Sequence, residues 1–404
     1  MINIRSIGLC TIINLIFVSS IANAIGFRLP NQDPEAIARG NAFVATADNP
    51  SAIYHNPAGI SQLDEGNHFS IGTYLISANV DFESATGGPD GETDESIQVV
   101  PQLHYVHNLA DSKFSVGVGL YAPYGLGIEW DGSPFPTLAE EGELIYTSLN
   151  PVFAYQVTPN LSLAGGITVN YSEVDLTQEI LPGEEFNVSG DGTDIGFNLG
   201  LLWNISSQFT LGAAYRSETE IDYDGESQAL SILAATQDFV DTSASLVFPE
   251  YLDVGVAFRP SDKWLFEVNV DWTNWDAVDD TVFVGTALGE IVLPLNYESS
   301  FIYEFGLTRT LKNQFLLSAG YIFSENSVPD ETFTPFNPDA DFQLGSIGIS
   351  SREGKIGWSF GYHFAYNGGR DVTGNQTGSL LGETADGEFR TLNHAVNLAL
   401  RFSF

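Results

Sequence analysis

Long runs of this chain alternate between bulky apolar residues and small or polar residues, and this period of two restricts the fold more than any other feature. Successive residues of a β-strand point to opposite faces of the sheet, so each run has one apolar face and one small or polar face. In two of the three clearest runs the apolar face begins or ends with Trp or Tyr, which favour membrane interfaces. The pattern predicts transmembrane strands. The clearest runs are 264–272, 356–366 and 395–404.

The connections between such runs alternate between tight turns and long loops, as in bacterial outer-membrane barrels. We therefore predict an all-β fold, a transmembrane antiparallel β-barrel of about 14 strands with its tight turns in the periplasm. Strands are expected to begin near residues 67, 96, 113, 144, 160, 190, 208, 240, 262, 299, 314, 341, 355 and 390. Tight turns are expected at 111–112, 159–160, 206–207, 260–261, 312–313 and 353–354. Long loops are expected at 84–95, 123–143, 181–189, 225–239, 277–298, 325–340 and 368–389.

The first residues have the features of a removable export signal. Arg5 precedes an apolar core at residues 7–18, and Ala22-Asn23-Ala24 matches a cleavage site, so residues 1–24 are expected to be a signal peptide. No later stretch reaches the roughly 20 apolar residues that a spanning helix requires. Cys10 is the only cysteine and lies in this signal, so we expect no disulfide or thiol chemistry in the mature chain.

Residues 25–66 lack strand alternation and instead carry signals for helix ends. Asp33-Pro34 and Asn49-Pro50 each mark a helix start, and Gly40 is placed to end the first helical turn. The tetrapeptide at residues 56–59 stops the second helix, because Pro57 disfavours helical geometry in the residue before it. We predict an N-terminal helical plug, or hatch, in the lumen of a barrel formed by residues 67–404.

The composition supports a membrane barrel and excludes several partners. Only 16% of the residues are charged and 40 are glycine, which suits transmembrane strands better than a soluble protein. The net charge of −38 argues against nucleic acid and against docking onto anionic lipid. Acidic residues gather in loops such as 90–95 and 330–341. We favour solvated loops over calcium sites there, because the spacing fits no calcium-binding motif.

An enzymatic function is not supported by the sequence. The six histidines are scattered, and no Ser, His and Asp set can be proposed from their spacing, so we expect no catalytic residues, no metal and no cofactor. His104 and His107 have an odd offset, which places them on opposite faces of a strand. For His55, in the plug, we favour a structural role over a proton switch.

Several motifs resemble those of the FadL/TodX family of outer-membrane transporters of long-chain fatty acids and aromatic hydrocarbons. The resemblance covers essentially the whole mature chain and implies a monomeric barrel of about 14 strands closed by an N-terminal hatch. In the plug it rests on Gly26-Phe27-x-Leu29, on residues 38–42 and 47–52, and on Asn56-Pro57-Ala58-Gly59. In the barrel it rests on residues 121–127, 150–151, 249–251, 258–264, 327–330 and 337–341.

The resemblance also implies a transport route. The substrate is caught by apolar patches on extracellular loops, moves to a pocket under the plug that includes the N-terminal residues, and leaves laterally through the barrel wall at an inward kink in the third strand. These positions are implied only by matching the family motifs. Gly26, Phe27 and Leu29 would contact the substrate; Asn56, Pro57, Ala58 and Gly59 would lock the hatch; Tyr121, Ala122 and Pro123 would mark the kink and the lateral opening.

The loop at residues 225–239 is a candidate for the capture patch. Its apolar residues lie on a segment with helical character, and exposed apolar patches on loops tend to mark binding sites. The alternative is that they only pack the loop down, and both interpretations stand. The preceding loop, 181–189, is short for a family that builds its capture site from two adjacent loops. The residues of the candidate patch are Leu230, Ile232, Leu233 and Phe239.

We therefore predict an outer-membrane transporter of a Gram-negative cell that takes up hydrophobic substrates, foremost long-chain fatty acids. The alternative is a structural or adhesive outer-membrane protein with a plugged lumen. A general porin is disfavoured, because a plug would obstruct diffusion. Because apolar pockets discriminate weakly by size, the sequence does not choose between fatty acids and aromatic hydrocarbons. The other expected partners are outer-membrane lipid and, through the terminal Phe404, the barrel assembly machinery.

Overall fold

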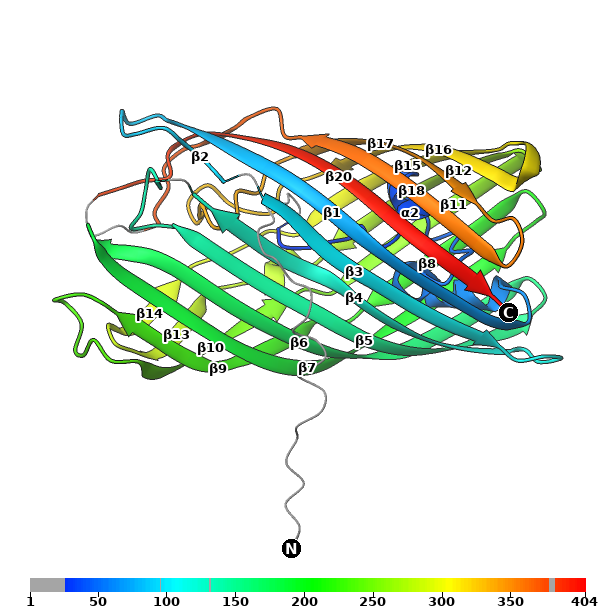
Figure 1. The fold of residues 1–404 in the computed structure, drawn as a ribbon, viewed down its shortest axis with the longest axis horizontal. Helices are drawn as coiled ribbons and strands as arrows, with labels where there is room; N and C mark the ends of the chain where they lie inside the picture. The colour runs from blue at the N-terminus through cyan, green and yellow to red at the C-terminus, as the bar shows by residue number, and fades with distance from the viewer. Residues whose placement is uncertain (1–25, 95, 131, 378–381) are drawn as a thin grey trace, which may run out of the picture.

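The computed structural model describes residues 26–94, 96–130, 132–377 and 382–404 (Figure 1). The predicted signal peptide, residues 1–24, lies outside the described residues. The described chain forms a closed antiparallel β-barrel whose wall has 14 strands, which confirms the predicted fold class. Among the described residues, no helix is long and apolar enough to cross a membrane.

The wall strands follow one another around the barrel in chain order, and β1 pairs with β20 to close it. Two wall strands are interrupted once each and carry two labels. The wall consists of β1 (Gly66–Ser84), β3 (Ser96–Asn108), β4 (Phe114–Glu129), β5 (Glu141–Thr158), β6 (Leu161–Leu181), β7 (Glu184–Asn204), β8 with β9 (Phe209–Arg216, Thr219–Ala229), β10 with β11 (Val240–Phe248, Tyr251–Ser261), β12 (Trp264–Thr273), β15 (Ser300–Thr310), β16 (Phe315–Ser324), β17 (Phe342–Ser351), β18 (Ile356–Tyr366) and β20 (Gly387–Ser403).

Short elements belong to the connections and to the plug. In the connections they are β2 (Gly91–Glu92), β13 (Thr281–Thr286), β14 (Gly289–Leu293), β19 (Arg370–Val372), η2 (Trp275–Ala277) and η3 (Lys312–Gln314). In the plug they are α2 (Pro34–Ile37), α3 (Ala52–His55) and η1 (Pro57–Gln62). The plug lies in the lumen, in the half of the barrel that carries the tight turns and the C-terminus (Figure 1).

Three predictions about loops are wrong. The expected loop at residues 123–143 is shorter, because β4 continues to Glu129 and β5 begins at Glu141. The expected long loop at residues 181–189 is a tight turn at Pro182-Gly183, because the ladder between β6 and β7 continues to the pair Leu181 and Glu184. Gly183 has a φ of +76°, which suits a tight turn, and Phe186 and Val188 keep the inward alternation of β7. The loop at residues 225–239 is also shorter, since β9 extends to Ala229, and the remaining residues form turns without a helix.

The predicted alternation of faces is confirmed in the wall strands. In β12, Phe266, Val268 and Val270 are exposed on the outer face, whereas Glu267 and Asn269 are buried in the lumen. The lumenal polar residues have partners in the plug: the Glu267 carboxylate accepts from the Ala45 amide at 2.7 Å. The polar face of the strands therefore binds the plug rather than water alone.

The plug begins as its capping residues predict. The Asp33 carboxylate accepts from the amides of Glu35 and Ala36 at 2.9 and 3.2 Å and so caps α2. The second helix, α3, starts later than Asn49-Pro50 suggests, because the Asn49 side chain accepts from the Ser51 amide and holds a turn first. It ends at His55, since the next residue is extended before Pro57.

Inward-facing glycines let the plug touch the wall backbone. A Cβ atom on Gly320 would lie 1.9 Å from the amide nitrogen of Gly40, and one on Gly212 would lie 2.1 Å from the carbonyl oxygen of Val44. Any side chain at these positions would displace the plug. We call the inner wall surface that contacts the plug its seat. Close contact at this seat explains part of the glycine-rich composition. Other glycines of this seat are Gly200, Gly255, Gly306, Gly348 and Gly361.

Candidate functional site: an apolar lumen above the plug

An apolar cavity of about 90 Å³, here called the lower cavity, lies between the plug and the loops, and not under the plug as expected. Phe27 of the plug contributes to its lining, and the remaining residues come from the wall strands and from the connections at the loop end. The apolar lining consists of Leu126, Leu144, Val174, Leu176, Tyr223, Ala244 and Leu246 of the wall and of Phe283, Leu293, Leu295, Tyr297 and Phe336 of the connections. The polar lining residues are Glu143, Thr281, Thr334 and Asn337.

A second cavity of about 130 Å³, the upper cavity, lies next to it on the loop side. The two cavities share Leu176, Phe283 and Phe336, so together they form a tract that leads from the loops to Phe27. The lining of the upper cavity also includes polar side chains, among them Thr137, Gln178 and Thr377. Two hydrogen bonds from different elements hold the loop that carries Phe336. The Trp130 indole donates to the Pro335 carbonyl at 3.1 Å, and the Asn337 side chain donates to the Tyr297 hydroxyl at 2.9 Å.

Four aromatic rings close the lower cavity toward the plug, and we call them the aromatic floor. Phe27 packs against Trp275, Phe248 and Tyr124 with ring centroids 4.9, 5.4 and 5.9 Å apart. The contacts with Trp275 and Phe248 are edge to face, a favourable arrangement of aromatic rings. Displacing Phe27 would therefore open the floor.

The strand β4 bulges inward beside this floor. Its pairing with β5 shifts between Tyr121 and Tyr124, so that Ala122 and Pro123 lie opposite a single residue of β5. The N-terminal segment pairs with this bulge. The Leu29 amide donates to the Pro123 carbonyl at 2.8 Å, and the Gly125 amide donates to the Phe27 carbonyl at 2.9 Å.

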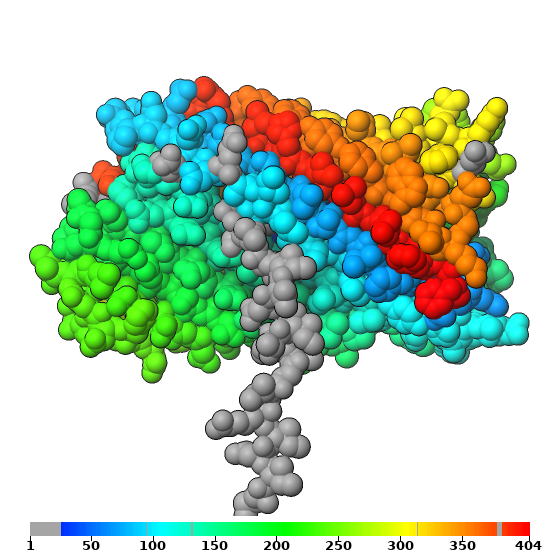
Figure 2. Space-filling view, viewed as in Figure 1, coloured from blue at the N-terminus to red at the C-terminus, as the bar shows by residue number. Residues whose placement is uncertain are grey.

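The ladder between β3 and β4 is incomplete at the same level. Its described pairs run from Asn108 with Ser115 to Leu103 with Leu120 and go no further toward the loops. Outside this end of the ladder is an apolar groove of about 900 Å³, lined mostly by outward-facing side chains. The strands beside it, β1 and β20, cross the face of the barrel shown in Figure 2. The groove residues include Val99, Pro101, Leu103, Leu120, Trp358 and Leu398.

The tetrapeptide at residues 56–59 joins parts of the plug to the wall. The Asn56 side chain donates to the Val44 carbonyl at 2.8 Å and to the Leu201 carbonyl of β7 at 2.9 Å, and it accepts from the Ala58 amide at 3.1 Å. Pro57 begins η1. A Cβ atom on Gly59 would lie 2.1 Å from the Ala47 carbonyl oxygen, so only glycine fits there.

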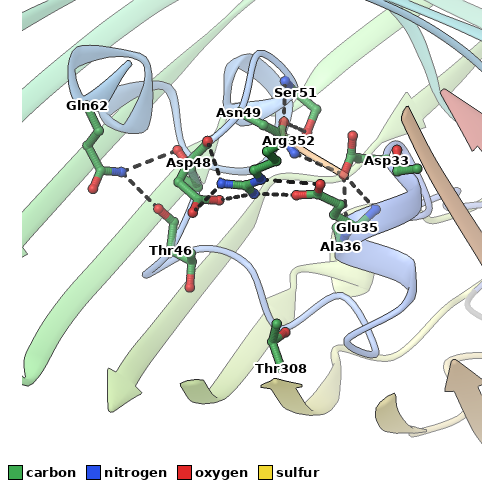
Figure 3. A network of polar contacts seen from close by, with 12 residues as sticks. Asp33, Glu35, Ala36, Thr46, Asp48, Asn49, Ser51, Gln62, Thr308 and Arg352 are labelled. Atoms are coloured by element: carbon green, nitrogen blue, oxygen red, sulfur yellow. Dashed lines mark hydrogen bonds and ion pairs between the residues drawn. The ribbon is translucent and has the colours of Figure 1, made fainter. Parts of the chain in front are cut away.

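Charged groups fix the plug at the end with the tight turns. Arg352, in the turn between β17 and β18, lies between Asp48 and Glu35 (Figure 3) and binds Asp48 at 2.8 Å. Arg401 of β20 binds Asp33 at 3.0 Å and also contacts Glu35. Burial alone would raise the pKa of Glu35, but the two guanidinium groups outweigh it and hold the pKa well below its ordinary value.

The histidines of the described part of the chain lie in separate surroundings. His55 packs between the rings of Phe43 and Tyr54, and burial lowers its pKa to about 3, so it is uncharged at neutral pH. This supports the structural role. His104 is buried, whereas His107 contacts Asn67, on the opposite face of β3 as predicted. No group of three or more His, Cys, Asp or Glu residues within the described ranges is placed to hold a metal ion.

The sequence-predicted substrate pocket residues lie in two different places. Phe27 lines the lower cavity, and Gly26 packs against the ring of Trp275. Leu29 lies in a separate apolar cluster with Ile37 and Tyr74. The hatch residues bind the wall through the Asn56 side chain. The β4 residues bind the N-terminal segment of the plug through the Pro123 carbonyl. The loop residues Leu230, Ile232, Leu233 and Phe239 are exposed, and Ile232 most of all at 82%.

Sequence reasoning missed most of the cavity lining. The signal that could have found it is a change from small polar to bulky apolar residues along the lumenal face of single strands. In β5, Leu144 and Tyr146 face the lumen near the loops, whereas Ser148 and Asn150 face it near the plug. Bulky apolar residues on the lumenal face therefore mark the cavity.

Comparison with known proteins agrees with this geometry. The family of outer membrane transport proteins described as OMPP1/FadL/TodX matches residues 15–404. The chain belongs to this family. It is an outer-membrane transporter of hydrophobic substrates, which confirms the predicted location and transport class. The family is one of transport channels and not of enzymes.

Individual members of the OMPP1/FadL/TodX family are distant in sequence. The chain is 22% identical over 386 residues to a long-chain fatty acid transport protein of Escherichia coli O6:H1 (strain CFT073), and the match covers 82% of this chain and 84% of that protein. It is 24% identical over 373 residues to a 47 kDa outer membrane protein of Pasteurella multocida, with 84% and 86% covered.

Solved structures share the fold. A Pseudomonas aeruginosa FadL homologue superposes with a TM-score of 0.84 at 18% identity, covering 94% of this chain and all of that chain. The Ralstonia pickettii toluene transporter TbuX superposes with a TM-score of 0.72 at 17% identity, covering 93% of this chain and all of that chain.

Proposed function

We propose that this protein takes up long-chain fatty acids and releases them through the barrel wall beside the β4 bulge. The observation that carries the proposal is the double role of the N-terminal segment. Phe27 closes the floor of the lower cavity, and the backbone of Phe27 and Leu29 is bonded to the bulge. A substrate that displaces Phe27 would therefore also loosen the wall.

The energetics favour a lined route for an apolar chain. Burial is worth about 0.8 kcal/mol per CH2 group, hence on the order of 10 kcal/mol for a long acyl chain. The lower cavity is smaller than a cavity of roughly 150 Å³ that binds benzene. A long acyl chain would therefore extend into the upper cavity, whereas a single aromatic ring would need only a small expansion.

The remaining steps follow from the positions of the apolar surfaces. The exposed residues Ile232 and Phe239 would capture the substrate at the loops. After the floor opens, the incomplete ladder above Leu103 and Leu120 would let the chain pass to the outer groove. Release into the lipid would avoid exposing the acyl chain to water.

Aromatic hydrocarbons are the second candidate class, since a toluene transporter shares the fold. The curated relatives named for long-chain fatty acid transport support fatty acids first. The structural or adhesive alternative would not require an apolar tract that ends at Phe27 of the plug.

The test is uptake of radiolabelled oleate and toluene by Gram-negative cells that lack their own long-chain transporter and express this protein. Ala244→Trp would fill the lower cavity and should lower uptake about tenfold or more, equivalent to about 1.4 kcal/mol. The control is Ser245→Trp, whose side chain lies on the other face of β10 and is exposed. Equal uptake by the Ala244→Trp variant and the wild type would refute the proposed route.

A further inference from the structure

Arg216 is a buried cation without an acidic partner. Four arginines of the described residues are buried, and three of them bind carboxylates. Arg28 binds Asp271 at 2.8 Å, Arg39 lies 3.9 Å from Glu267, and Arg401 binds Asp33 at 3.0 Å. Arg216 is 5% exposed, and none of the ion pairs within the described chain includes it.

The hydrogen bonds of Arg216 leave one nitrogen unused. Its Nε donates to the Tyr251 hydroxyl at 2.9 Å, and its Nη2 donates to the Tyr121 hydroxyl at 2.8 Å. The Nη1 atom is buried and has no hydrogen-bond partner. An unsatisfied buried N–H group on a charged side chain is costly, so the protein keeps a binding capacity here that its own residues do not use.

Arg216 lies on the side of the aromatic floor that faces away from the lower cavity, as the order of side chains along two walls shows. On β4, Leu126 lines the lower cavity, Tyr124 belongs to the floor, and Tyr121 contacts Arg216. On β10 and β11 the same order is Leu246, Phe248 and Tyr251. A substrate that passes the floor therefore meets Arg216 next.

Arg216 is also next to the proposed exit. Tyr121, its hydrogen-bond partner, is the last residue of β4 before the bulge and follows Leu120, where the β3–β4 ladder ends. The head group of a bound molecule at Arg216 would thus lie beside the incomplete part of the wall.

The simpler interpretation is that Arg216 only holds the plug and the wall together. Its guanidinium carbon lies 5.4, 5.3 and 5.9 Å from the ring centroids of Tyr54, Tyr121 and Tyr251. Such cation–π contacts are favourable. They leave the full positive charge without an anion, however, and a buried charge is normally paired.

We propose that Arg216 binds the carboxylate of the fatty acid after the substrate has passed the aromatic floor. The proposal rests on the proposed function, because it assumes an acidic hydrophobic substrate. The Nη1 group and the delocalised charge would form charge-assisted hydrogen bonds to a carboxylate. An uncharged hydrocarbon would gain nothing from this group, so Arg216 makes the site selective for acids over neutral molecules of equal length.

The experiment measures binding rather than transport. The purified full-length mature protein in lipid nanodiscs is titrated with oleate and with oleyl alcohol, which differ only in the head group. We expect the wild type to bind oleate about tenfold more tightly than oleyl alcohol. Arg216→Gln should lose this preference without weakening the binding of the alcohol, and Arg216→Lys should restore part of it by restoring the charge.

The control is Arg309→Gln, which removes an exposed arginine and should keep the wild-type preference. Folding of each variant is checked by the heat-dependent gel mobility of the barrel. Parallel loss of acid and alcohol binding in Arg216→Gln, or an unchanged preference, would overturn the proposal and leave uptake of hydrophobic molecules intact. If the wild type bound neither ligand, both this proposal and the proposed function would be wrong.

Discussion

The amide nitrogen of Leu29 lies 2.8 Å from the carbonyl oxygen of Pro123, which joins the plug to the bulge of the wall. Two residues earlier, the Phe27 ring lies in the floor of the lower cavity. Floor and wall are therefore connected through three residues of extended backbone. A movement of this segment would displace both the aromatic floor and the β4 bulge. We therefore predict that transport depends on the link between them.

Deleting Pro123 should straighten β4. The deletion removes the extra residue of the bulge and gives β4 and β5 a continuous register. We expect a folded barrel with oleate uptake reduced about tenfold, because the N-terminal segment loses its partner and the wall closes. Uptake assays in the transporter-deficient cells check this, and wild-type uptake by the deletion variant would contradict a role of the bulge.

Replacing Asn56 by Ala should unlock the plug. The change removes donors to the Val44 and Leu201 carbonyls and a cap on Ala58, with an expected cost of about 1–3 kcal/mol. Small polar antibiotics should enter cells faster, and the barrel should remain folded. Asn160→Ala, in an exposed turn, is the matched control and should leave permeability unchanged. Equal permeability of both variants would argue against the hatch assignment.

Replacing Gly320 by Val should displace the plug by steric exclusion. The new Cβ atom would lie 1.9 Å from the Gly40 amide nitrogen, and neither backbone can yield easily. We expect proteolysis of the plug and increased ion conductance in planar bilayers. Gly345→Val on β17 is the control, since no atom lies within 4 Å of its Cβ position. A well-protected plug in the Gly320 variant would show that the seat is not tight.

Acid should loosen the plug. Burial lowers the pKa of His55 to about 3 from its ordinary value of 6.5. Between these values an open plug binds a proton that the seated plug excludes. The free energy of opening therefore falls as the pH falls, by at most about 1.4 kcal/mol per pH unit. Hydrogen exchange of plug amides, corrected for intrinsic rates, measures this slope.

A second variant separates the histidine from the carboxylates. His55→Gln should flatten the slope between pH 6.5 and the folded pKa of about 3. Glu35 has a depressed pKa, so its contribution is present above its ordinary value of 4.5 and is lost only as the pH falls through the folded pKa. Above pH 4.5, the free energy of opening should therefore depend on pH through His55 and not through Glu35. If the His55→Gln variant and the wild type had the same slope there, His55 would not control opening.

The strand order and most strand ends follow from the sequence, because alternation is a local property. For the same local reason, the tight turn at Gly183 is not predicted. Few apolar residues, chiefly Phe186 and Val188, mark the start of β7 among acidic and glycine residues. Their pairing with β6 decides the length of the hairpin, and pairing is a property of two strands.

The candidate site could be predicted only in part. Phe27 was identified through its motif, but the cavity above it combines side chains from many strands and loops, and their meeting depends on the shape of the closed barrel. Arg216 carried no signal of its own. Only the folded structure shows whether a carboxylate lies beside an arginine. Beside Arg216 lie the hydroxyl groups of Tyr121 and Tyr251 instead.

The position of Arg401 also bears on how the molecule is assembled. This residue contacts Glu35 across 366 positions of the chain, and it stands on β20, which closes the barrel against β1. Contacts between such distant segments form late, because the chain between them must first be ordered. Closure of the barrel wall and insertion of the plug into the lumen are therefore expected to occur in the same step of biogenesis. A newly inserted barrel would then never have an unblocked lumen in the membrane.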